Sequence, residues 1–330
     1  FAYGSDAVII AKELEALGVD YLAVAYVNEG VILRDVGIKT PILVLHPQPE
    51  NFETLIDRCL EPSLYNESVL KQFIKIASEK KQLNYPVHLK FNTGLNRLGF
   101  NETEVDKIVS ELNATSNIKV TSLFSHLAAS EDLKEKCFSE SQISTFRNIA
   151  KNISSKLSYQ PKLHMSNTSG ILNYPEAQFD MVRSGIGLYG FSNIPEEQKN
   201  FIPIATLKSV ISQIHTIKKG DSVGYNRAFK SKGTIVTATI PIGHADGISR
   251  AYGNGKGWVM VQGIKAPIIG NVCMDMMMVN ITGIVCKEGD EVIVFGGNNK
   301  ADLLAESIES ISYELLTAIS QRVKREVCRK

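Results

Sequence analysis

The sequence predicts an α/β protein, a TIM-type (β/α)8 barrel followed by a mainly β C-terminal domain. Up to about residue 190, short apolar runs alternate with amphipathic segments, an alternation typical of a parallel sheet. From about residue 200, apolar runs are separated by Gly, Asp and Asn turns with hardly a helix between them. A length of 330 residues suits one barrel and one smaller unit. We therefore expect a barrel over residues 1–198 and a β-rich domain with a closing helix over 199–330.

The first half contains seven strand candidates, at residues 21–26, 41–46, 62–66, 86–91, 120–126, 162–167 and 180–185. Amphipathic segments such as 67–80 and 102–112 carry apolar residues at helical spacing between them. The chain opens directly on a predicted helix, at about residues 5–17, which an eighth strand should precede. The sequence thus predicts a barrel whose first strand lies before Phe1.

The second half contains six strand candidates, at residues 209–217, 233–241, 257–263, 265–272, 276–281 and 291–296. Only the stretch 303–323 returns to a helical period. The second unit is therefore expected to be a β domain closed by helical structure.

Composition argues against several classes of partner. With 36 basic and 35 acidic residues, the chain has no global attraction for nucleic acid or for an anionic membrane. No apolar run approaches the roughly 20 residues that cross a bilayer. The five cysteines are odd in number and never in C-x-x-C spacing, which favours a reducing, cytoplasmic location without a zinc site. The histidines show no metal-ligand spacing either.

Polar residues stand at the carboxyl ends of several predicted strands, the active face of such a barrel. They are Lys90, His126, Asn167 with Thr168, and Arg183 followed by Gly185 and Ile186. A single polar residue at a strand end usually satisfies backbone groups. Four in register with one active face predict a site, and the last two groups follow the strands where barrels often bind phosphate.

Residues 185–190, GIGLYG, match the G-x-G-x-x-G pattern of dinucleotide-binding folds. That fingerprint needs a following helix and an acidic residue about 20 positions later. Here the chain continues into FSNIPEE, and the window 203–212 holds no Asp or Glu. We interpret the match as chance, which leaves a nicotinamide dehydrogenase without other support.

Nine motifs in order make the chain resemble the alanine racemase family over essentially its whole length. They are AYG (2–4), HLKFNTGLNRLG (88–99), FSHLAASED (124–132), HMSNTSG (164–170), MVRSGIGLYG (181–190), GDSVGYN (220–226), GHADGISR (243–250), GNVCMDMMMV (270–279) and ISYELLT (311–317). The resemblance implies a pyridoxal phosphate enzyme that interconverts L- and D-alanine and supplies D-alanine for peptidoglycan. Its departures include His244, Asn92 and Asn271, where the family usually has Tyr, Asp and Arg.

The resemblance also implies how the cofactor is held. The lysine that binds it covalently would lie two residues before the position of Phe1, so we expect residues to precede Phe1 and expect no racemisation from a chain begun there. His126 would stack on the pyridine ring, Arg183 would face the ring nitrogen, and Asn167 would line the site. The phosphate ligands would be Tyr3, Thr168, Gly185, Ile186 and Tyr313.

Racemisation removes a proton from one face of Cα and returns it to the other, so two bases must flank the substrate. The resemblance assigns the lysine to one face and Tyr225 to the other, with Tyr225 and the segment Cys273–Met274–Asp275 supplied by the second subunit of a homodimer that shares its active sites. Arg97 would bind the substrate carboxylate with Met274. Lys90 would lie beside Arg97, either carbamylated or as an ordinary lysine. Cys273 could equally be a buried strand residue.

Other interpretations stay open at this stage. A broader-specificity amino-acid racemase would use the same residues. A related pyridoxal phosphate decarboxylase would share both domains, but the sequence lacks its G-G-G loop and its E-P-G-R motif. A non-catalytic cofactor-binding barrel would not need a β domain. Some bacteria fuse such a racemase to a cell-wall ligase, which is a possible partner on the same chain.

Overall fold

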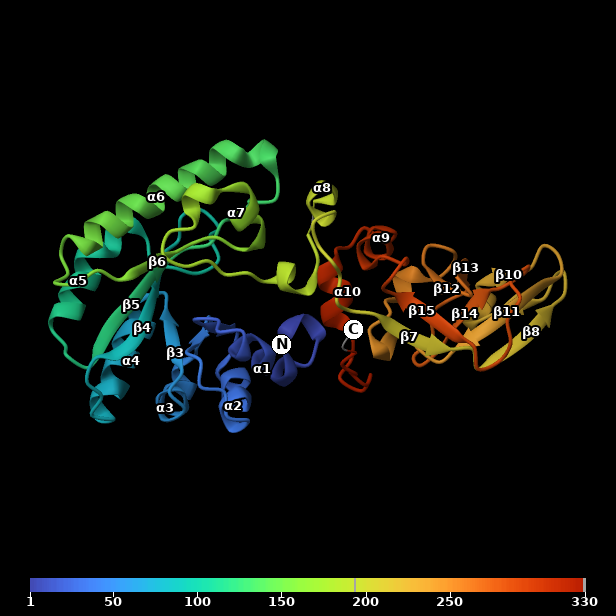
Figure 1. Cartoon of the computed structure of the whole chain (residues 1–330), viewed down its shortest axis with the longest axis horizontal. Coiled ribbons are helices and arrows are strands. Elements are labelled where there is room, and N and C mark those ends of the chain that lie inside the picture. The colour runs from blue at the N-terminus through green and yellow to red at the C-terminus, as the bar shows by residue number, and fades with distance from the viewer. Residues whose placement is uncertain (193, 329–330) are drawn as a thin grey trace. The chain divides into compact units, whose positions relative to one another are not determined.

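The computed structural model describes residues 1–192 and 194–328 and contains two compact units (Figure 1). The first comprises Phe1 and Ala7–Gly185, and the second comprises Ala2–Asp6 and the chain from Ile186 onward. The first unit is built on a parallel sheet with helices, and the second on an antiparallel sheet. The predicted fold class, a barrel-type α/β unit followed by a β-rich unit, is confirmed.

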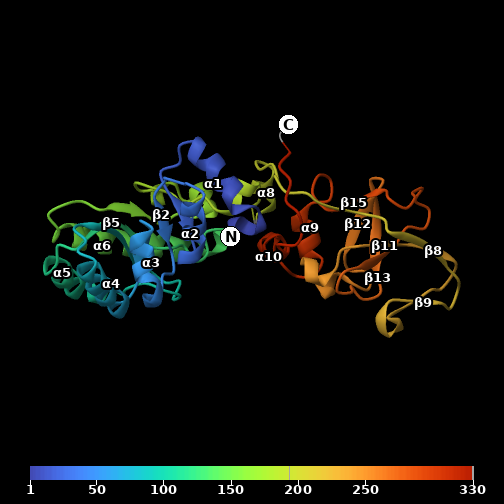
Figure 2. The ribbon, with the colours of Figure 1, turned by 90° about the horizontal axis from the view of Figure 1, so that it is seen from below.

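The parallel sheet has six strands in the order β1-β2-β3-β4-β5-β6, each paired with its successor in the chain. The strands are β1 Leu22–Val24, β2 Ile42–Val44, β3 Glu61–Leu64, β4 Tyr85–Lys90, β5 Ile118–Phe124 and β6 Lys162–His164. The helices of this unit are α1 Ala7–Ala16, α2 Val27–Asp35, α3 Phe52–Asp57, α4 Glu67–Glu79, α5 Val105–Asn113, α6 Lys136–Ser154 and α7 Thr168–Asn173. Figures 1 and 2 show the sheet curled, with helices on its outer side, so the unit is a half-barrel.

The prediction of a full seventh strand at 180–185 is wrong in extent. This segment forms a single parallel bridge, between Met181 and His164 of β6. The backbone N–H of Asp180 donates to Leu163 O at 3.0 Å, but the N–H of Leu163 donates to the Asp180 carboxylate at 2.8 Å. A side chain therefore takes the place of one backbone ladder bond, which ends regular pairing at this edge.

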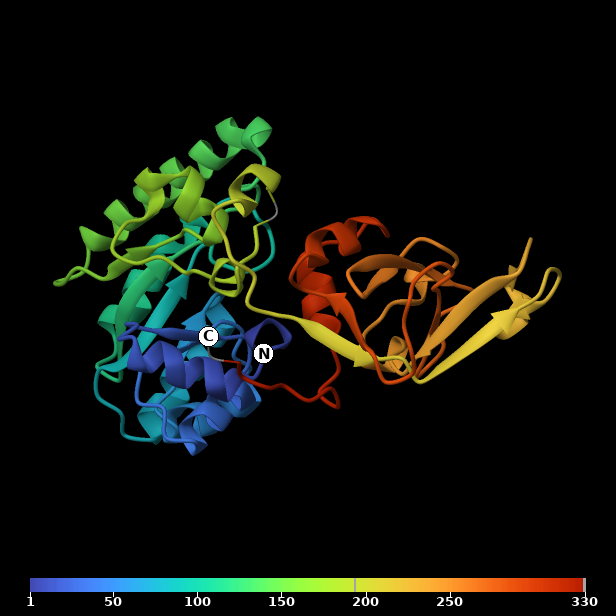
Figure 3. The same cartoon turned by 45° about the vertical axis from the view of Figure 1, so that its right-hand side comes forward.

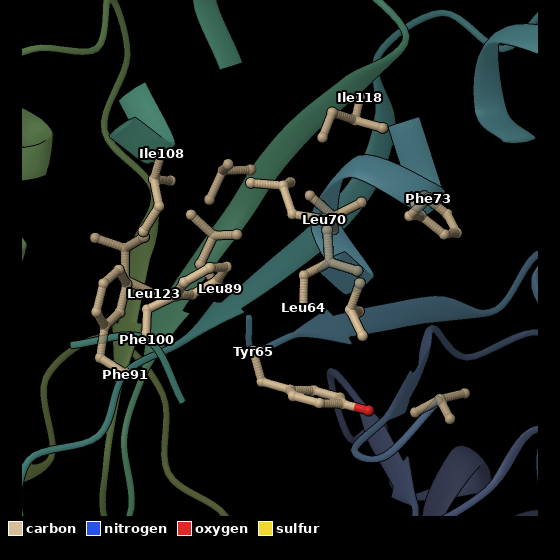
Figure 4. Close-up of a cluster of buried hydrophobic side chains, with 14 of the residues drawn as sticks. Leu64, Tyr65, Leu70, Phe73, Leu89, Phe91, Phe100, Ile108, Ile118 and Leu123 are labelled. Atoms are coloured by element: carbon tan, nitrogen blue, oxygen red, sulfur yellow. The ribbon is translucent and has the colours of Figure 1, made fainter. Parts of the chain in front are cut away.

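The core of the first unit joins the strands to the inner faces of the helices. Helix α4 begins at an Asn66 cap, whose Oδ1 accepts from Val69 N at 2.9 Å. Its Phe73 is fully buried, as is Leu89 of the sheet. Figure 4 shows these side chains in one cluster with Leu64, Tyr65, Leu70, Phe91, Phe100, Ile108, Ile118 and Leu123. This packing fixes the strands whose ends carry the predicted site residues.

The second unit has a seven-stranded antiparallel sheet in the order β7-β15-β12-β13-β14-β11-β8 (Figure 3). Its strands are β7 Leu207–Val210, β8 Gln213–Ile217, β11 Ile235–Ile240, β12 Trp258–Val261, β13 Ile264–Ile269, β14 Met277–Asn280 and β15 Glu291–Phe295, and a small ribbon adds β9 Ser222–Val223 and β10 Phe229–Lys230. The prediction of one strand over 209–217 is wrong. Ile211 N donates to Asp290 O whereas Ser212 N donates to Thr239 O, so adjacent residues pair with different strands. Strands β7 and β8 are joined directly through Ile211 and Ser212, yet they lie at opposite ends of the strand order. The sheet must therefore curl to bring its two ends together.

The second unit also contains helices α8 Pro195–Gln198, α9 Ala301–Glu306 and α10 Ser312–Ala318. The helical stretch predicted over 303–323 is therefore interrupted, at a point where Glu309 adopts a left-handed φ of 59°. Across the residues that the structure describes, no helix is both long and apolar enough to cross a membrane.

Candidate active site

The guanidinium of Arg183 is held by groups at the ends of β5 and β6. Its Nη2 donates to Ser125 O at 2.8 Å and to Met165 O at 3.0 Å, and lies 3.2 Å from His126 Nδ1. Its Nη1 donates to Nδ1 of His164. A planar guanidinium with contacts on two of its nitrogens has one orientation only. Arg183 is therefore fixed in direction, and His164 is a partner that the sequence analysis did not single out.

Lys90, Arg97 and Arg183 bring positive charge together around His126. Burial, with the charges of Arg97 and Arg183, lowers the pKa of Lys90 to about 8. Burial and the neighbouring cations lower the pKa of His126 to about 3, so its ring is neutral at neutral pH. Within the described chain, none of these three cations forms an ion pair with a carboxylate. The cluster therefore suits an anionic ligand.

A hydrogen bond links the two loops that follow β6 and the Met181 bridge. Gly185 N donates to Thr168 Oγ1 at 3.0 Å, at the face where barrels of this kind often bind phosphate. Asn167 instead caps α7, because its Oδ1 accepts from Gly170 N at 2.9 Å and from Ser130 Oγ at 2.8 Å. Thr168 and Gly185, both predicted site residues, thus lie within hydrogen-bond distance of each other. Asn167 fixes the turn that precedes Thr168.

Three tyrosines gather in the second unit. The ring of Tyr3 lies 5.0 Å from that of Tyr189 and 5.7 Å from that of Tyr313. Burial raises the pKa of Tyr3, so the group stays a phenol that can donate. Ile186 is buried and opens the 3₁₀ turn Ile186–Tyr189. Tyr189 belongs to the GIGLYG segment, of which the sequence analysis singled out only Gly185 and Ile186.

Gly4 explains why the AYG segment ends in glycine. Its φ is +82°, and a Cβ there would lie 2.1 Å from Leu316 O in α10. The carbonyl oxygen of Gly4 accepts from Arg325 Nη2 at 2.8 Å. The turn that carries Tyr3 is therefore held backbone-to-backbone against the helix that carries Tyr313.

Tyr225 shares one hollow with the Cys273–Met274–Asp275 segment. The hollow has a volume of about 460 Å³, and Gly224, Thr239, Met276 and Met278 also line it. The Tyr225 side chain is 73% exposed and that of Met274 59% exposed. Cys273 is partly buried. The structure therefore brings these four predicted residues together on an accessible surface of the second unit.

The Cys273–Met274–Asp275 segment is anchored from two sides. The backbone N–H groups of His244 and Ala245 donate to Cys273 O at 3.0 Å and Met274 O at 2.9 Å. Arg322, which the sequence analysis missed, donates to Asp275 Oδ1 and to Asp246 Oδ1, both at 2.7 Å. Asp275 is thus engaged in an ion pair, and this role was hidden because its partner lies 47 residues away.

Comparison with known proteins gives one consistent family. The N-terminal domain of alanine racemases matches residues 1–193, and the C-terminal domain matches residues 204–327. The alanine racemase of Sorangium cellulosum is 34% identical over 98% of this chain and 88% of its own length. A solved alanine racemase from Clostridium difficile 630 superposes with a TM-score of 0.90 at 34% identity, over 98% of this chain and 86% of that one. An alanine racemase from Bartonella henselae with covalently bound pyridoxal phosphate superposes with a TM-score of 0.88 at 27% identity, over 98% of this chain and 89% of that one.

Proposed function

Since this protein belongs to the alanine racemase family and interconverts L- and D-alanine, we propose that it does so with pyridoxal phosphate as its cofactor. The D-alanine would supply peptidoglycan synthesis in the cytoplasm. Pyridoxal phosphate, when bound, withdraws electrons from the Cα of an attached amino acid and makes its proton removable. The other steps fall to side chains of the protein.

The fixed guanidinium of Arg183 carries the proposal. A group that only donates hydrogen bonds suits a cofactor ring nitrogen that is left unprotonated. Burial lowers the pKa of Arg183 to about 10, so the group remains charged at neutral pH. An unprotonated ring nitrogen withdraws electrons less strongly, which favours return of the Cα proton over transfer of the amino group. The neutral ring of His126 would stack on the cofactor ring.

The proposed phosphate ligands offer neutral donors rather than charges. The Thr168 hydroxyl accepts from Gly185 N, and a hydroxyl is a group that can also donate. Tyr3 and Tyr313 offer phenols, and Gly185 and Ile186 offer backbone N–H groups. Asn167 would line the same end of the site. These groups fit a phosphate ester, which hydroxyls and backbone amides bind well.

We assign the second base to Tyr225, supplied by the other subunit of a homodimer. Its exposure, and that of Met274 beside it, supports a role that a second chain completes. Arg97 would bind the substrate carboxylate as a charge-assisted pair, joined by the Met274 backbone amide. Lys90 would orient Arg97. Cys273 and Asp275 would shape the same side of the substrate site.

Absorption spectroscopy on the full-length protein tests the assignment. We expect reconstitution with pyridoxal phosphate to give a visible band that shifts when L-alanine is added, together with formation of D-alanine. L-serine and L-lysine, tested in parallel, would reveal a broader racemase, and release of carbon dioxide would reveal a decarboxylase. Undiminished racemisation after complete removal of the cofactor would refute the proposal.

A further inference from the structure

A continuous chain of hydrogen bonds crosses the interior of the half-barrel and ends at Arg183. Glu61 of β3 lies 2.8 Å from His88 Nε2 of β4, and His88 Nδ1 lies 2.6 Å from Ser122 Oγ of β5. Ser122 Oγ lies 2.8 Å from His164 Nε2 of β6, and His164 Nδ1 accepts from Arg183. The first three contacts join neighbouring strands of the sheet, and the last joins β6 to Arg183. We call these five residues the interior relay.

The two ends of the interior relay determine the direction of every bond in it. Arg183 can only donate, so His164 must accept at Nδ1 and carry its proton on Nε2. Burial, with Arg183 and His88 nearby, holds the pKa of His164 well below its usual range, which agrees with a neutral ring. The Nε2–H of His164 then donates to Ser122 Oγ.

The remaining bonds follow in the same direction. Within the described chain, Ser122 Oγ has two hydrogen-bond partners, and because His164 Nε2 donates to it, Nδ1 of His88 must accept the hydroxyl proton. His88 therefore carries its proton on Nε2 and donates it to the Glu61 carboxylate. Tyr21 also donates to that carboxylate at 3.1 Å, and burial beside Glu61 raises the pKa of the Tyr21 phenol. A carboxylate can only accept, so Glu61 and Arg183 impose the same direction of hydrogen-bond donation on the whole relay.

Such a chain is not needed to fill the core. His88, Ser122 and His164 are at most 1% exposed, in a sheet whose other buried positions are largely Leu, Val and Ile. Buried polar groups cost free energy unless each is satisfied, and apolar side chains would avoid that cost. Here every ring nitrogen has a partner. The satisfied network is therefore best explained by the guanidinium that it holds.

We infer that Glu61, His88 and Ser122 are positioning residues that fix the tautomer of His164 and thereby the direction of Arg183 toward its ligand. The inference rests on the proposed role of Arg183 beside the cofactor ring nitrogen. The relay itself is a property of the protein without cofactor, so its two parts can be tested separately. The relay holds the Arg183 guanidinium in place and keeps its acceptor, Nδ1 of His164, deprotonated.

The first test is nitrogen NMR of histidine side chains in the cofactor-free, full-length protein. His164 and His88 are both expected as neutral tautomers protonated on Nε2. Ser122→Ala removes the acceptor of the His164 Nε2–H, so a second tautomer of His164, to which Arg183 no longer donates, should become populated. Ser63→Ala is the matched control, because Ser63 is the strand partner of His88 and its buried hydroxyl has no hydrogen-bond partner in the structure. Ser63→Ala should leave both tautomers unchanged.

The second test is the kinetics of the pyridoxal phosphate-loaded variants. Ser122→Ala and Glu61→Gln should lower kcat and kcat/KM together by roughly 10-fold or more, with the KM for alanine nearly unchanged, as for lost support of a positioned group. Cofactor affinity should change little, because the proposed phosphate ligands are untouched. Glu61→Gln keeps the shape of the side chain and decides the question if Ser122→Ala folds poorly.

The outcomes separate the relay from the proposed function. His164 protonated on Nδ1 in the wild type, or wild-type kcat in both variants, would overturn the relay. Ser63→Ala matching Ser122→Ala in both readouts would also overturn it, since loss of packing alone would then be the cause. A wild-type protein with the expected tautomers that binds no pyridoxal phosphate would leave the relay standing and refute the cofactor assignment.

Discussion

Arg183 is held by acceptors from the ends of two strands, whereas the Tyr225 side chain, proposed for the same reaction, is 73% exposed. The cation cluster of the first unit is buried enough to shift the pKa values of Lys90 and His126. The Tyr225 hollow of the second unit is open and lined by exposed methionines. The contacts that fix Arg183 thus all come from one chain.

The difference follows from what each region has to do. Groups that steer a bound cofactor must point in one direction before it arrives, and buried hydrogen bonds give that direction. A phenol that exchanges a proton with Cα needs surroundings that exclude water, which the open hollow does not offer. We therefore expect the Tyr225 hollow to work only when a second subunit covers it.

The largest expected effect comes from Tyr225→Phe, which keeps the ring and removes the hydroxyl. Racemisation by the full-length protein should fall by about 10²-fold or more, as for loss of a positioned acid–base group. Bound pyridoxal phosphate should be retained, which its visible band would show. Incubation of each alanine enantiomer in D2O measures exchange at Cα on each face.

This exchange experiment separates one base from two. Exchange should persist from the enantiomer whose Cα proton faces the remaining base and nearly vanish from the other. Equal loss from both enantiomers would rule out Tyr225 as the base of one face only.

On the buried side, His126 should make the protein sensitive to acid. Its pKa is about 3 in the folded protein, against about 6.5 for an ordinary histidine. Below pH 6.5 the unfolded chain takes up a proton that the folded protein refuses, so stability is lost as pH falls toward 3. At pH 5 this amounts to about 2 kcal/mol.

His126→Gln removes the titrating imidazole and should reduce the loss of folding stability as pH falls. Urea unfolding of cofactor-free wild type and variant, at pH 7, 6 and 5, measures it. His164 is likewise shifted downward and stays in both proteins, so some acid dependence should remain. Parallel curves for the two proteins would show that His126 is not the source.

The same contrast explains what the sequence could predict. Strand–helix alternation located Lys90, His126 and Arg183, because the carboxyl ends of parallel strands meet at one face. It could not show that His164 binds Arg183, since a histidine inside an apolar run has no signature of its partner. Nor could it show that Asp180 replaces a ladder bond with its side chain, a choice made by local geometry.

In the second unit, sequence patterns located most strands but not their pairing. The run 209–217 looks like one strand because Val, Ile and Thr recur along it and no Gly, Pro, Asp or Asn interrupts it, while its two halves pair with strands far apart in the chain. The anchor from Arg322 to Asp275 was invisible for the same reason. Long-range partners are what a local pattern cannot encode. The boundary predicted between residues 198 and 199 remains a prediction.

Arg322 offers a way to loosen the open region without touching Tyr225. Arg322→Ala removes the donor shared by Asp246 and Asp275, so the Cys273–Met274–Asp275 segment loses one of its anchors. We expect kcat/KM to fall by roughly 3- to 10-fold through misplacement of that segment. Lys324→Ala, which removes a nearby exposed partner of Glu326, is the control and should be silent. Equal kcat/KM in the Arg322 variant and the wild type would show that the Arg322 ion pairs are not needed to place this segment.

The smallest effect concerns Lys90, where the buried region carries an unfavourable charge. Its pKa is about 8 in the folded protein, against about 10.4 for an ordinary lysine, so the unfolded chain binds more protons between these values. Stability should therefore rise with pH from about 8 to 10.4 in the wild type and not in Lys90→Met. At pH 7 the variant should be more stable by about 1 kcal/mol, after allowance for solvent screening.

Carbamylation would relieve the same penalty. The neutral amine of Lys90 adds to carbon dioxide and releases a proton, which replaces a cation beside Arg97 and Arg183 with an anion. Intact mass measured after incubation with bicarbonate, and again after acid treatment, should show gain and loss of one carbon dioxide that Lys90→Met lacks. With the modification in place, wild type and variant should differ less in stability. An unchanged mass would leave Lys90 as an ordinary lysine, and a stability curve parallel to that of Lys90→Met would remove it from the cation cluster as well.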